Sequence, residues 1–142
     1  MEKSCGVVLF NGQKVLLLQY AIGQKEGDWE LQGHWDFPKG HVDKGETEVE
    51  TATRELKEET GIRNIILSDK FRQTINYTFQ KGDRKIAKEV VFFVATTIET
   101  KINLSHEHVD YGWFDFTSAS KKLTYDNARS VLKDAIIFYE KN

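Results

Sequence analysis

Cysteine and proline are almost absent from this chain of 142 residues, which holds one of each, Cys5 and Pro38. A lone cysteine cannot form an intramolecular disulfide, so a disulfide-stabilised secreted fold is excluded and a cytoplasmic location is expected. Because Cys5 lies in an apolar segment, we expect a buried, unreactive thiol. No apolar stretch has the length of a transmembrane helix, and the N-terminal residues lack the apolar core of a signal peptide, so neither is expected.

A strong excess of charge of either sign is also missing. The 20 lysines and arginines nearly balance the 22 aspartates and glutamates, which gives a formal net charge of −2. Proteins that bind nucleic acids or membrane surfaces generally carry a basic excess, so we expect neither as a stable partner. Repeats, low-complexity tracts and linkers are absent from the sequence, and its length suits a single domain over residues 1–142.

Several segments have the composition or the alternation of β-strands. The predicted strands are Cys5–Phe10, Lys14–Tyr20, Phe71–Lys81, Arg84–Ile98 and a short one at Trp113–Phe116. The dipeptides Asn11-Gly12 and Gly82-Asp83 are turn signals that would join the first four strands as two hairpins. Apolar residues at three- and four-residue spacing along Asp126–Glu140 predict a final helix with one side facing the core.

Another helix is predicted between Thr47 and Gly61. Thr47 and Glu50 have the spacing of a capping box, and Gly61 suits the left-handed conformation that ends many helices. An apolar stripe runs along the helix at Val49, Ala52 and Leu56. One side of this helix should therefore pack on the protein, while a neighbouring side remains polar.

The polar side of this helix carries three carboxylates, Glu55, Glu58 and Glu59, at spacings of three and four residues. Like charges so placed repel each other and weaken an isolated helix. A solvated acidic helix is the ordinary explanation, whereas a Mg²⁺ or Mn²⁺ ion, which prefers oxygen ligands, would offset the repulsion. The preceding segment His34–His41 favours the metal, because Pro38 stiffens a loop that leads to a helix N-terminus, where anions are favoured.

Together these residues resemble the signature of the Nudix hydrolases. The matching positions are Gly40, Glu46, Arg54, Glu55, Leu56, Glu58, Glu59, Gly61 and Ile62. The resemblance implies an α/β (α+β) fold, a Nudix α/β/α sandwich with a mixed sheet, a catalytic loop and helix, and a C-terminal helix. It also implies metal-dependent hydrolysis of nucleoside diphosphates that are linked to another group.

The resemblance gives roles to individual residues of the signature. The implied metal ligands are Glu55, Glu58, Glu59 and the backbone carbonyl of Lys39. Glu46 and Arg54 are implied to orient the loop and the helix, and Arg54 is also one helical turn from Glu58 and can pair with it. A carboxylate must take the proton of the attacking water. Glu55, Glu58 and Glu107 are the candidates, and Glu58 or Glu55 is favoured.

Further segments resemble one group within the family, the asymmetrical diadenosine tetraphosphate hydrolases. They are Trp35–Val42, Leu104–His108 with Tyr111 and Trp113 following, and Asn76-Tyr77 with Lys88 on the partner strand. This resemblance implies that diadenosine tetraphosphate is cleaved to ATP and AMP. A slightly acidic protein needs metal ions and well-placed lysines to bind such a polyphosphate, for which Lys39 and Lys88 are the candidates.

The remaining candidate residues would bind the bases and phosphates of such a substrate. Tyr77 and Tyr111 could stack on adenine, although a strand tyrosine can equally fill the core. His41 follows the signature glycine and would reach the phosphates. Glu107 lies where the group has a further carboxylate near the metal. Its flanking histidines have no cysteine beside them, so we expect them to orient the loop or to touch phosphate rather than to bind zinc.

Other functions remain open at this stage. The same chemistry would act on RNA 5′ ends, diphosphoinositol polyphosphates or modified nucleotides, and a non-catalytic nucleotide-sensing domain is a further alternative. RNA ends and inositol pyrophosphates both call for a more basic site than a net charge of −2 suggests. The sequence leaves the oligomeric state open, as well as the role of the loop Ala21–Gly33 and of Trp29 within it.

Overall fold

The structure of the chain, a computed structural model, describes residues 2–21 and 33–142, so Trp29 and most of its loop lie outside the described residues. Seven strands form a mixed sheet with the main order β3-β2-β1-β6-β5, while β4 pairs with β1 and β7 pairs with β2. The elements are β1 (Glu2–Asn11), β2 (Lys14–Tyr20), β3 (Trp35–Asp36), β4 (Lys39–His41), α1 (Glu48–Thr60), β5 (Ile65–Lys81), β6 (Arg84–Thr97), β7 (His108–Asp115), α2 (Phe116–Lys122) and α3 (Asp126–Glu140).

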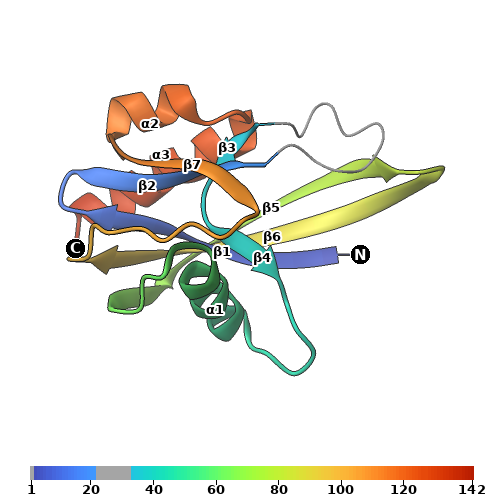
Figure 1. The fold of residues 1–142 in the computed structure, drawn as a ribbon, viewed down its shortest axis with the longest axis horizontal. Coiled ribbons are helices and arrows are strands. Elements are labelled where there is room, and N and C mark those ends of the chain that lie inside the picture. The colour runs from blue at the N-terminus through green and yellow to red at the C-terminus, as the bar shows by residue number, and fades with distance from the viewer. Residues whose placement is uncertain (1, 22–32) are drawn as a thin grey trace.

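The sheet separates two apolar cores, because successive side chains of a strand point to opposite faces. Val7 and Leu9 of β1 pack with Leu56 of α1, whereas Val8 and Phe10 belong to the core beneath α2 and α3. Figure 1 shows α1 on one side of the sheet and α2 and α3 on the other. The predicted sandwich with a mixed sheet is confirmed. Within the described residues, no helix is both long and apolar enough to cross a membrane.

The helix α1 begins and ends where the sequence predicts. Thr47 and Glu50 form both hydrogen bonds of the capping box, and Gly61 adopts a φ of 79° as its N–H donates to the Lys57 carbonyl. The apolar stripe is buried against β1, with Ala52 and Leu56 each 1% exposed. Because local spacing determines both the caps and the stripe, these features could be predicted without knowledge of the fold.

The first hairpin has the predicted strands but a turn that is displaced by one residue. Asn11 pairs with Lys14, so the two residues of the loop are Gly12 and Gln13 rather than Asn11 and Gly12. Asn11 instead donates through its side-chain amide to the Glu99 carbonyl. The second hairpin turns at Gly82-Asp83 as predicted, since Lys81 pairs with Arg84.

Two predictions of secondary structure were wrong in their extent. The strand expected at Phe71–Lys81 begins already at Ile65, and a bulge between Ser68 and Arg72 breaks its alternation. The short strand expected at Trp113–Phe116 is β7, and Phe116 begins the unpredicted helix α2. Asp115 caps α2 by accepting from the Ser118 N–H at 2.8 Å. The Asp-x-x-Ser spacing is typical of a helix N-cap, so the start of α2 could have been predicted from the sequence.

Candidate active site

The site begins with an ion-pair network around Arg54 on α1. Arg54 Nε lies 2.6 Å from Glu46 Oε2, and its Nη1 lies 2.7 Å from Glu55 and 3.1 Å from Glu58. Its Nη2 also donates to the His41 carbonyl at 2.9 Å. The Arg54 guanidinium lowers the pKa of Glu46 to about 2. Arg54 thus joins the β4–α1 loop to two of the three carboxylates on the helix.

Gly40 is the point at which β4 passes closest to α1. A Cβ atom at Gly40 would lie 2.0 Å from the carboxyl group of Glu55, far inside van der Waals contact. Gly40 pairs with Cys5, whose side chain faces α1, so both residues point to this side of the sheet. Only a residue without a side chain leaves room here for the Glu55 carboxylate.

Glu59 is the buried member of the three carboxylates, with 4% exposure. Its Oε1 accepts a hydrogen bond from the Lys39 backbone N–H at 3.1 Å. Burial, reinforced by the charge and hydrogen bonding of Glu55, raises the pKa of Glu59 to about 9. Two adjoining carboxyl groups need either a shared proton or a cation between them.

The donor set of α1 fits a hard divalent cation. Glu55 and Glu59 offer adjoining oxygens, and Glu58 is largely exposed on the same face, with its side chain 57% accessible. In the part of the chain that the structure describes, no three acidic, histidine or cysteine side chains already have a ligating arrangement. Arg54 instead forms ion pairs with both Glu55 and Glu58, and its positive charge offsets theirs.

Lys39 connects the carboxylates with the opposite face of the sheet. Adjacent residues of a strand alternate, so Lys39 points away from α1 although its N–H contacts Glu59. Its side chain is 14% exposed, lies 3.9 Å from Asp36 Oδ2, and is 5.4 Å from the ring centre of Tyr20. The lysine side chain is therefore held between Asp36 and Tyr20 rather than extended into solvent.

Most of the predicted substrate residues gather on this second face. Tyr77 pairs directly with Lys88 across β5 and β6, and Lys88 pairs with Glu2 of β1, so the three side chains share a face. His41 joins them through a 3.2 Å contact between its Nε2 and Glu2 Oε1. Burial, reinforced by the charge of Lys39, lowers the pKa of Lys88 to about 8.

Tyr111 and Glu107 do not join this group. Tyr111 pairs with Leu18, which belongs to the core on the α1 side, so it lies on the opposite face of the sheet from Tyr77. Glu107 is exposed in the turn before β7. The structure therefore separates the two tyrosines that the sequence grouped together.

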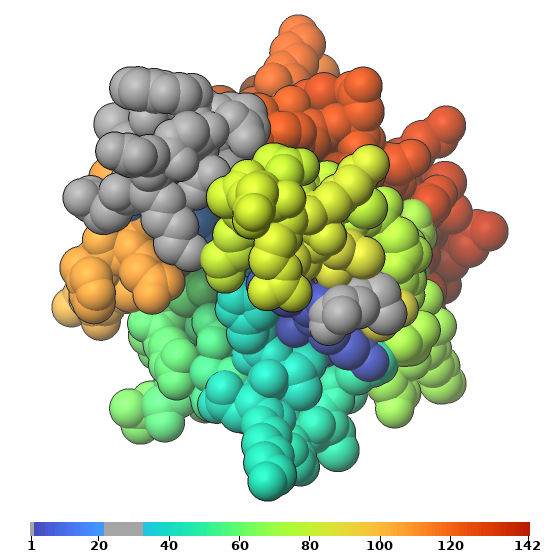
Figure 2. Space-filling view, turned by 90° about the vertical axis from the view of Figure 1, so that its right-hand side faces the viewer, coloured from blue at the N-terminus to red at the C-terminus, as the bar shows by residue number. Residues whose placement is uncertain are grey.

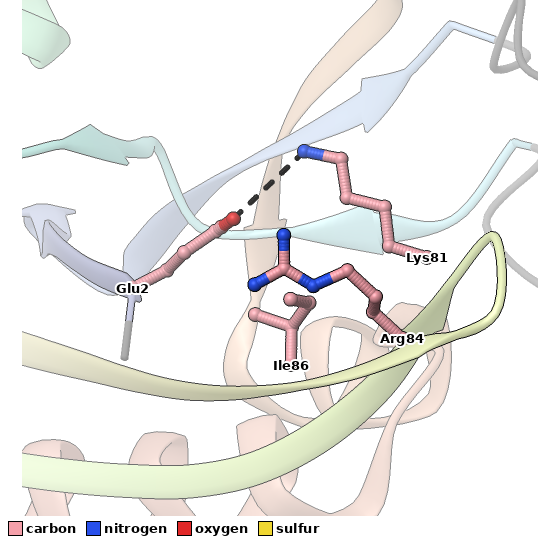
Figure 3. A pocket seen from close by; sticks show the side chains of 4 residues that line it. All are labelled: Glu2, Lys81, Arg84 and Ile86. Atoms are coloured by element: carbon pink, nitrogen blue, oxygen red, sulfur yellow. Dashed lines mark ion pairs between the residues drawn. The ribbon is translucent and has the colours of Figure 1, made fainter.

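An open hollow of about 480 Å³ extends the second face toward the tip of the β5–β6 hairpin. Figure 3 shows Glu2 pointing to Lys81 across it, with Arg84 and Ile86 beside them. The Lys81–Glu2 distance is 4.0 Å. Figure 2 shows the end of the molecule that is formed by this hairpin, the β4–α1 segment (cyan) and the segment before β7 (orange). Lys81 and Arg84 were not predicted, because only the pairing of the strands brings them to Glu2.

No role was predicted for two polar residues around Lys39, Asp36 and Tyr20, whereas a third, His108, was expected to orient its loop or to touch phosphate. Asp36 is 7% exposed and pairs with Lys39, while the Tyr20 hydroxyl donates to the Phe37 carbonyl at 3.1 Å. His108 is buried, and burial lowers the pKa of its ring to about 4, so the ring is neutral at pH 7. In the sequence, such residues can be recognised only as polar residues within apolar strands. This pattern does not show which partner each residue contacts.

Comparison with known proteins agrees with this geometry. The family model of the NUDIX domain matches residues 2–135. The asymmetrical bis(5′-nucleosyl)-tetraphosphatase of Rattus norvegicus is 32% identical over 146 residues, which cover 93% of this chain and 91% of the rat protein. The crystal structure of a Caenorhabditis elegans Ap4A hydrolase binary complex matches with a TM-score of 0.84 and 29% identity, over 100% of both chains.

A relative with a different named substrate matches a shorter part of the chain. The RNA pyrophosphohydrolase of Bartonella quintana (strain Toulouse) is 40% identical over 79 residues, which cover 55% of this chain and 46% of that protein. The match of the family model over almost the whole chain, together with the fold and the arrangement around α1, shows that this chain belongs to the Nudix hydrolase family.

Proposed function

We propose that this protein is a Mg²⁺-dependent hydrolase of dinucleoside polyphosphates that cleaves diadenosine tetraphosphate to ATP and AMP. The rat tetraphosphatase and the nematode Ap4A hydrolase, both similar to this chain over nearly its whole length, support this substrate class. Nudix hydrolases generally use divalent metals; Mg²⁺ is proposed here, and Mn²⁺ would suit the same oxygen ligands. The single buried cysteine agrees with a cytoplasmic protein.

One observation carries the proposal, namely the position of Lys39 between two groups of residues. Its backbone contacts Glu59, beside Glu55 on the α1 face. Its ammonium group lies on the other face with Tyr77 and Lys88. A phosphate chain that reaches the carboxylates would pass this lysine on the way to an aromatic residue that can stack on a base.

The residues divide the chemistry among them. Glu55, Glu58 and Glu59, with the Lys39 carbonyl, would hold the cation, and Arg54 with Glu46 would keep Glu55 and the loop in place. When bound, Mg²⁺ would neutralise charge on the phosphate oxygens and acidify the attacking water. Glu58 is the most exposed of the three carboxylates, so it can reach that water, while Glu55 remains the other candidate base.

On the second face, the proposed roles are binding and orientation. Lys39, Lys88 and His41 would neutralise non-bridging phosphate oxygens, and Tyr77 would stack on one adenine. Tyr111, on the other face, would serve a different part of the substrate. Glu107 stays a proposed further carboxylate, because its exposed turn leaves its side chain able to approach α1 from β7.

The test is the incubation of the purified protein with Mg²⁺ and diadenosine tetraphosphate, followed by chromatography of the products. We expect equal amounts of ATP and AMP, and no products once a chelator removes the metal. Glu58→Gln and Glu59→Gln should each lower turnover by about 10²-fold or more while leaving the fold intact. Two ADP molecules as products would contradict the proposed cleavage position.

A second candidate substrate is the triphosphorylated 5′ end of RNA. The Bartonella relative is named for RNA pyrophosphohydrolysis, and Lys81 and Arg84 add positive charge beyond Lys88. The same assay with a short 5′-triphosphorylated RNA compares the two substrates. Release of pyrophosphate from RNA without turnover of the dinucleotide would replace the first proposal by the second.

A further inference from the structure

The buried imidazole of His108 has no role in the proposed binding of metal or substrate. Its side chain is 0% exposed, and its Nε2 has no hydrogen-bond partner among the described residues. A buried polar atom without a partner is costly, so such atoms usually have a function. Glu59 Oε1 lies 4.0 Å from this nitrogen, just beyond hydrogen-bonding distance.

Ser105 contacts the other nitrogen of the His108 ring, Nδ1. Ser105 Oγ lies 3.0 Å from His108 Nδ1, and it also accepts the Glu107 N–H at 3.4 Å. The hydroxyl hydrogen of Ser105 is then free to donate to Nδ1. When it does, Nδ1 is the acceptor and the ring proton lies on Nε2, the nitrogen that faces Glu59.

The segment before β7 is fixed to the end of α1, so this approach is built into the backbone. The Ser105 N–H donates to the Glu59 carbonyl at 3.2 Å, and the Asn103 N–H donates to the Thr60 carbonyl at 2.9 Å. Lys39 approaches the same side-chain oxygen of Glu59 through its own N–H. The Lys39 N–H of β4 and the His108 Nε2 of β7 thus both lie near Glu59 Oε1.

We propose that His108 is a positioning residue for Glu59. Its Nε2–H donates to Glu59 Oε1 when Glu59 binds a divalent cation, and Ser105 fixes the required tautomer. The 4.0 Å separation shortens to a charge-assisted hydrogen bond in that state. The inference rests on the proposed metal-binding role of Glu59. Partners of this kind orient metal ligands, and their loss typically weakens metal affinity about 10- to 100-fold.

Two matched variants test the proposal by Mn²⁺ affinity, which is measured by electron paramagnetic resonance of the free ion without substrate. In His108→Gln the amide nitrogen can take the place of Nε2, whereas in His108→Asn it overlaps Nδ1 and stops short of Glu59. We expect the asparagine variant to bind Mn²⁺ about 10- to 100-fold more weakly and the glutamine variant to bind close to normally. Equal affinities of the asparagine variant and the unchanged protein would overturn the proposal.

Glu59→Gln separates this inference from the proposed function. If this variant binds Mn²⁺ normally, the metal-binding role of Glu59 fails, and the inference fails with it. If it loses affinity while His108→Asn does not, only the inference fails.

Nitrogen NMR of the His108 ring in the unchanged protein is independent of whether any variant folds. We expect the Nε2–H tautomer, and a loss of tautomer preference in Ser105→Ala but not in Ser105→Thr. An Nδ1–H tautomer in the unchanged protein would also overturn the proposal.

Discussion

At the scale of single residues, the site depends on a backbone position without a side chain. Gly40 has ordinary backbone angles, so its conformation does not require glycine. What requires glycine is space, because the Glu55 carboxyl group occupies the position of a Cβ atom. A signature glycine can thus be needed for packing against a functional group rather than for a turn.

Gly40→Ala should therefore impair catalysis more than folding. The added methyl group displaces Glu55, and a shift of about 1 Å at such a site costs about 10²-fold in turnover. The measurement is kcat for diadenosine tetraphosphate beside the thermal unfolding midpoint. Gly12→Ala is the control, because Gly12 has a φ of 59° and open space around it, so that variant should lose stability and keep its kcat. A normal kcat in Gly40→Ala would contradict the argument.

Lys88 predicts a pH dependence of substrate binding. Burial lowers the pKa of Lys88 to about 8, so the side chain is charged below that pH and neutral above it. Attraction to phosphate is therefore present below pH 8 and lost as the pH rises through it. We expect KM to rise across this range in the unchanged protein. In Lys88→Arg the rise should disappear, because arginine keeps its charge. A persistent rise would assign it to another group.

At the scale of elements, an ion-pair cluster joins three segments that are distant in sequence. Glu48 in the first turn of α1 accepts two hydrogen bonds from Arg72 of β5, both of 2.8 Å. Lys3 of β1 lies 2.5 Å from the same carboxylate. The hydrogen bonds from Arg72, with a further one from Lys3, lower the pKa of Glu48 to about 2 against the opposing effect of desolvation.

Glu48→Gln should lower the stability at neutral pH by about 1 kcal/mol, the upper range for partly exposed ion pairs. Because the folded-state pKa of Glu48 lies below its usual 4.5, this stabilisation is present above pH 4.5 and declines as the pH falls toward 2. Urea unfolding at pH 7 and pH 2.5 measures the difference from the unchanged protein, which should shrink at the lower pH. Glu140→Gln, at the exposed end of α3, is the control. A difference that is independent of pH would refute the role of the charge.

At the scale of the whole molecule, the sheet divides the predicted substrate residues between its two faces. Tyr77 lies with Lys88 on the face of α3, whereas Tyr111 lies on the face of α1. Two tyrosines on opposite faces cannot enclose the same base. The tyrosine that adjoins the lysines is the stronger candidate for stacking on adenine.

Tyr77→Ala should accordingly raise KM for diadenosine tetraphosphate by about 5- to 100-fold, the equivalent of one lost base stack. A base-free polyphosphate should be turned over as before, and Tyr77→Phe, which keeps the ring, should behave like the unchanged protein. Tyr111→Ala measured in parallel shows whether the second tyrosine contributes independently. An equal effect of Tyr77→Ala on the base-free substrate would show that Tyr77 supports the fold instead.

The sequence by itself determined the features that depend on local spacing. The caps of α1, the stripe that buries Leu56, and the shared helical face of Glu55, Glu58 and Glu59 all follow from residues within one or two helical turns. The family resemblance extended this to the fold and to the pairing of Glu46 with Arg54. The helix features and the Glu46–Arg54 pair depend on residues that are close in sequence, whereas the fold came from the resemblance.

Only the tertiary structure decided which distant residues meet. The register of β4 against β1 turns Gly40 toward α1 and Lys39 toward the other face, and the pairing of β7 with β2 places Tyr111 away from Tyr77. The burial of Glu59 and the approach of His108 to it depend on the segment before β7 folding over the end of α1. Strand register and layer packing depend on residues far apart in sequence. A shift of one residue in the register of a strand would turn its side chains, such as Lys39 or Tyr111, to the other face of the sheet.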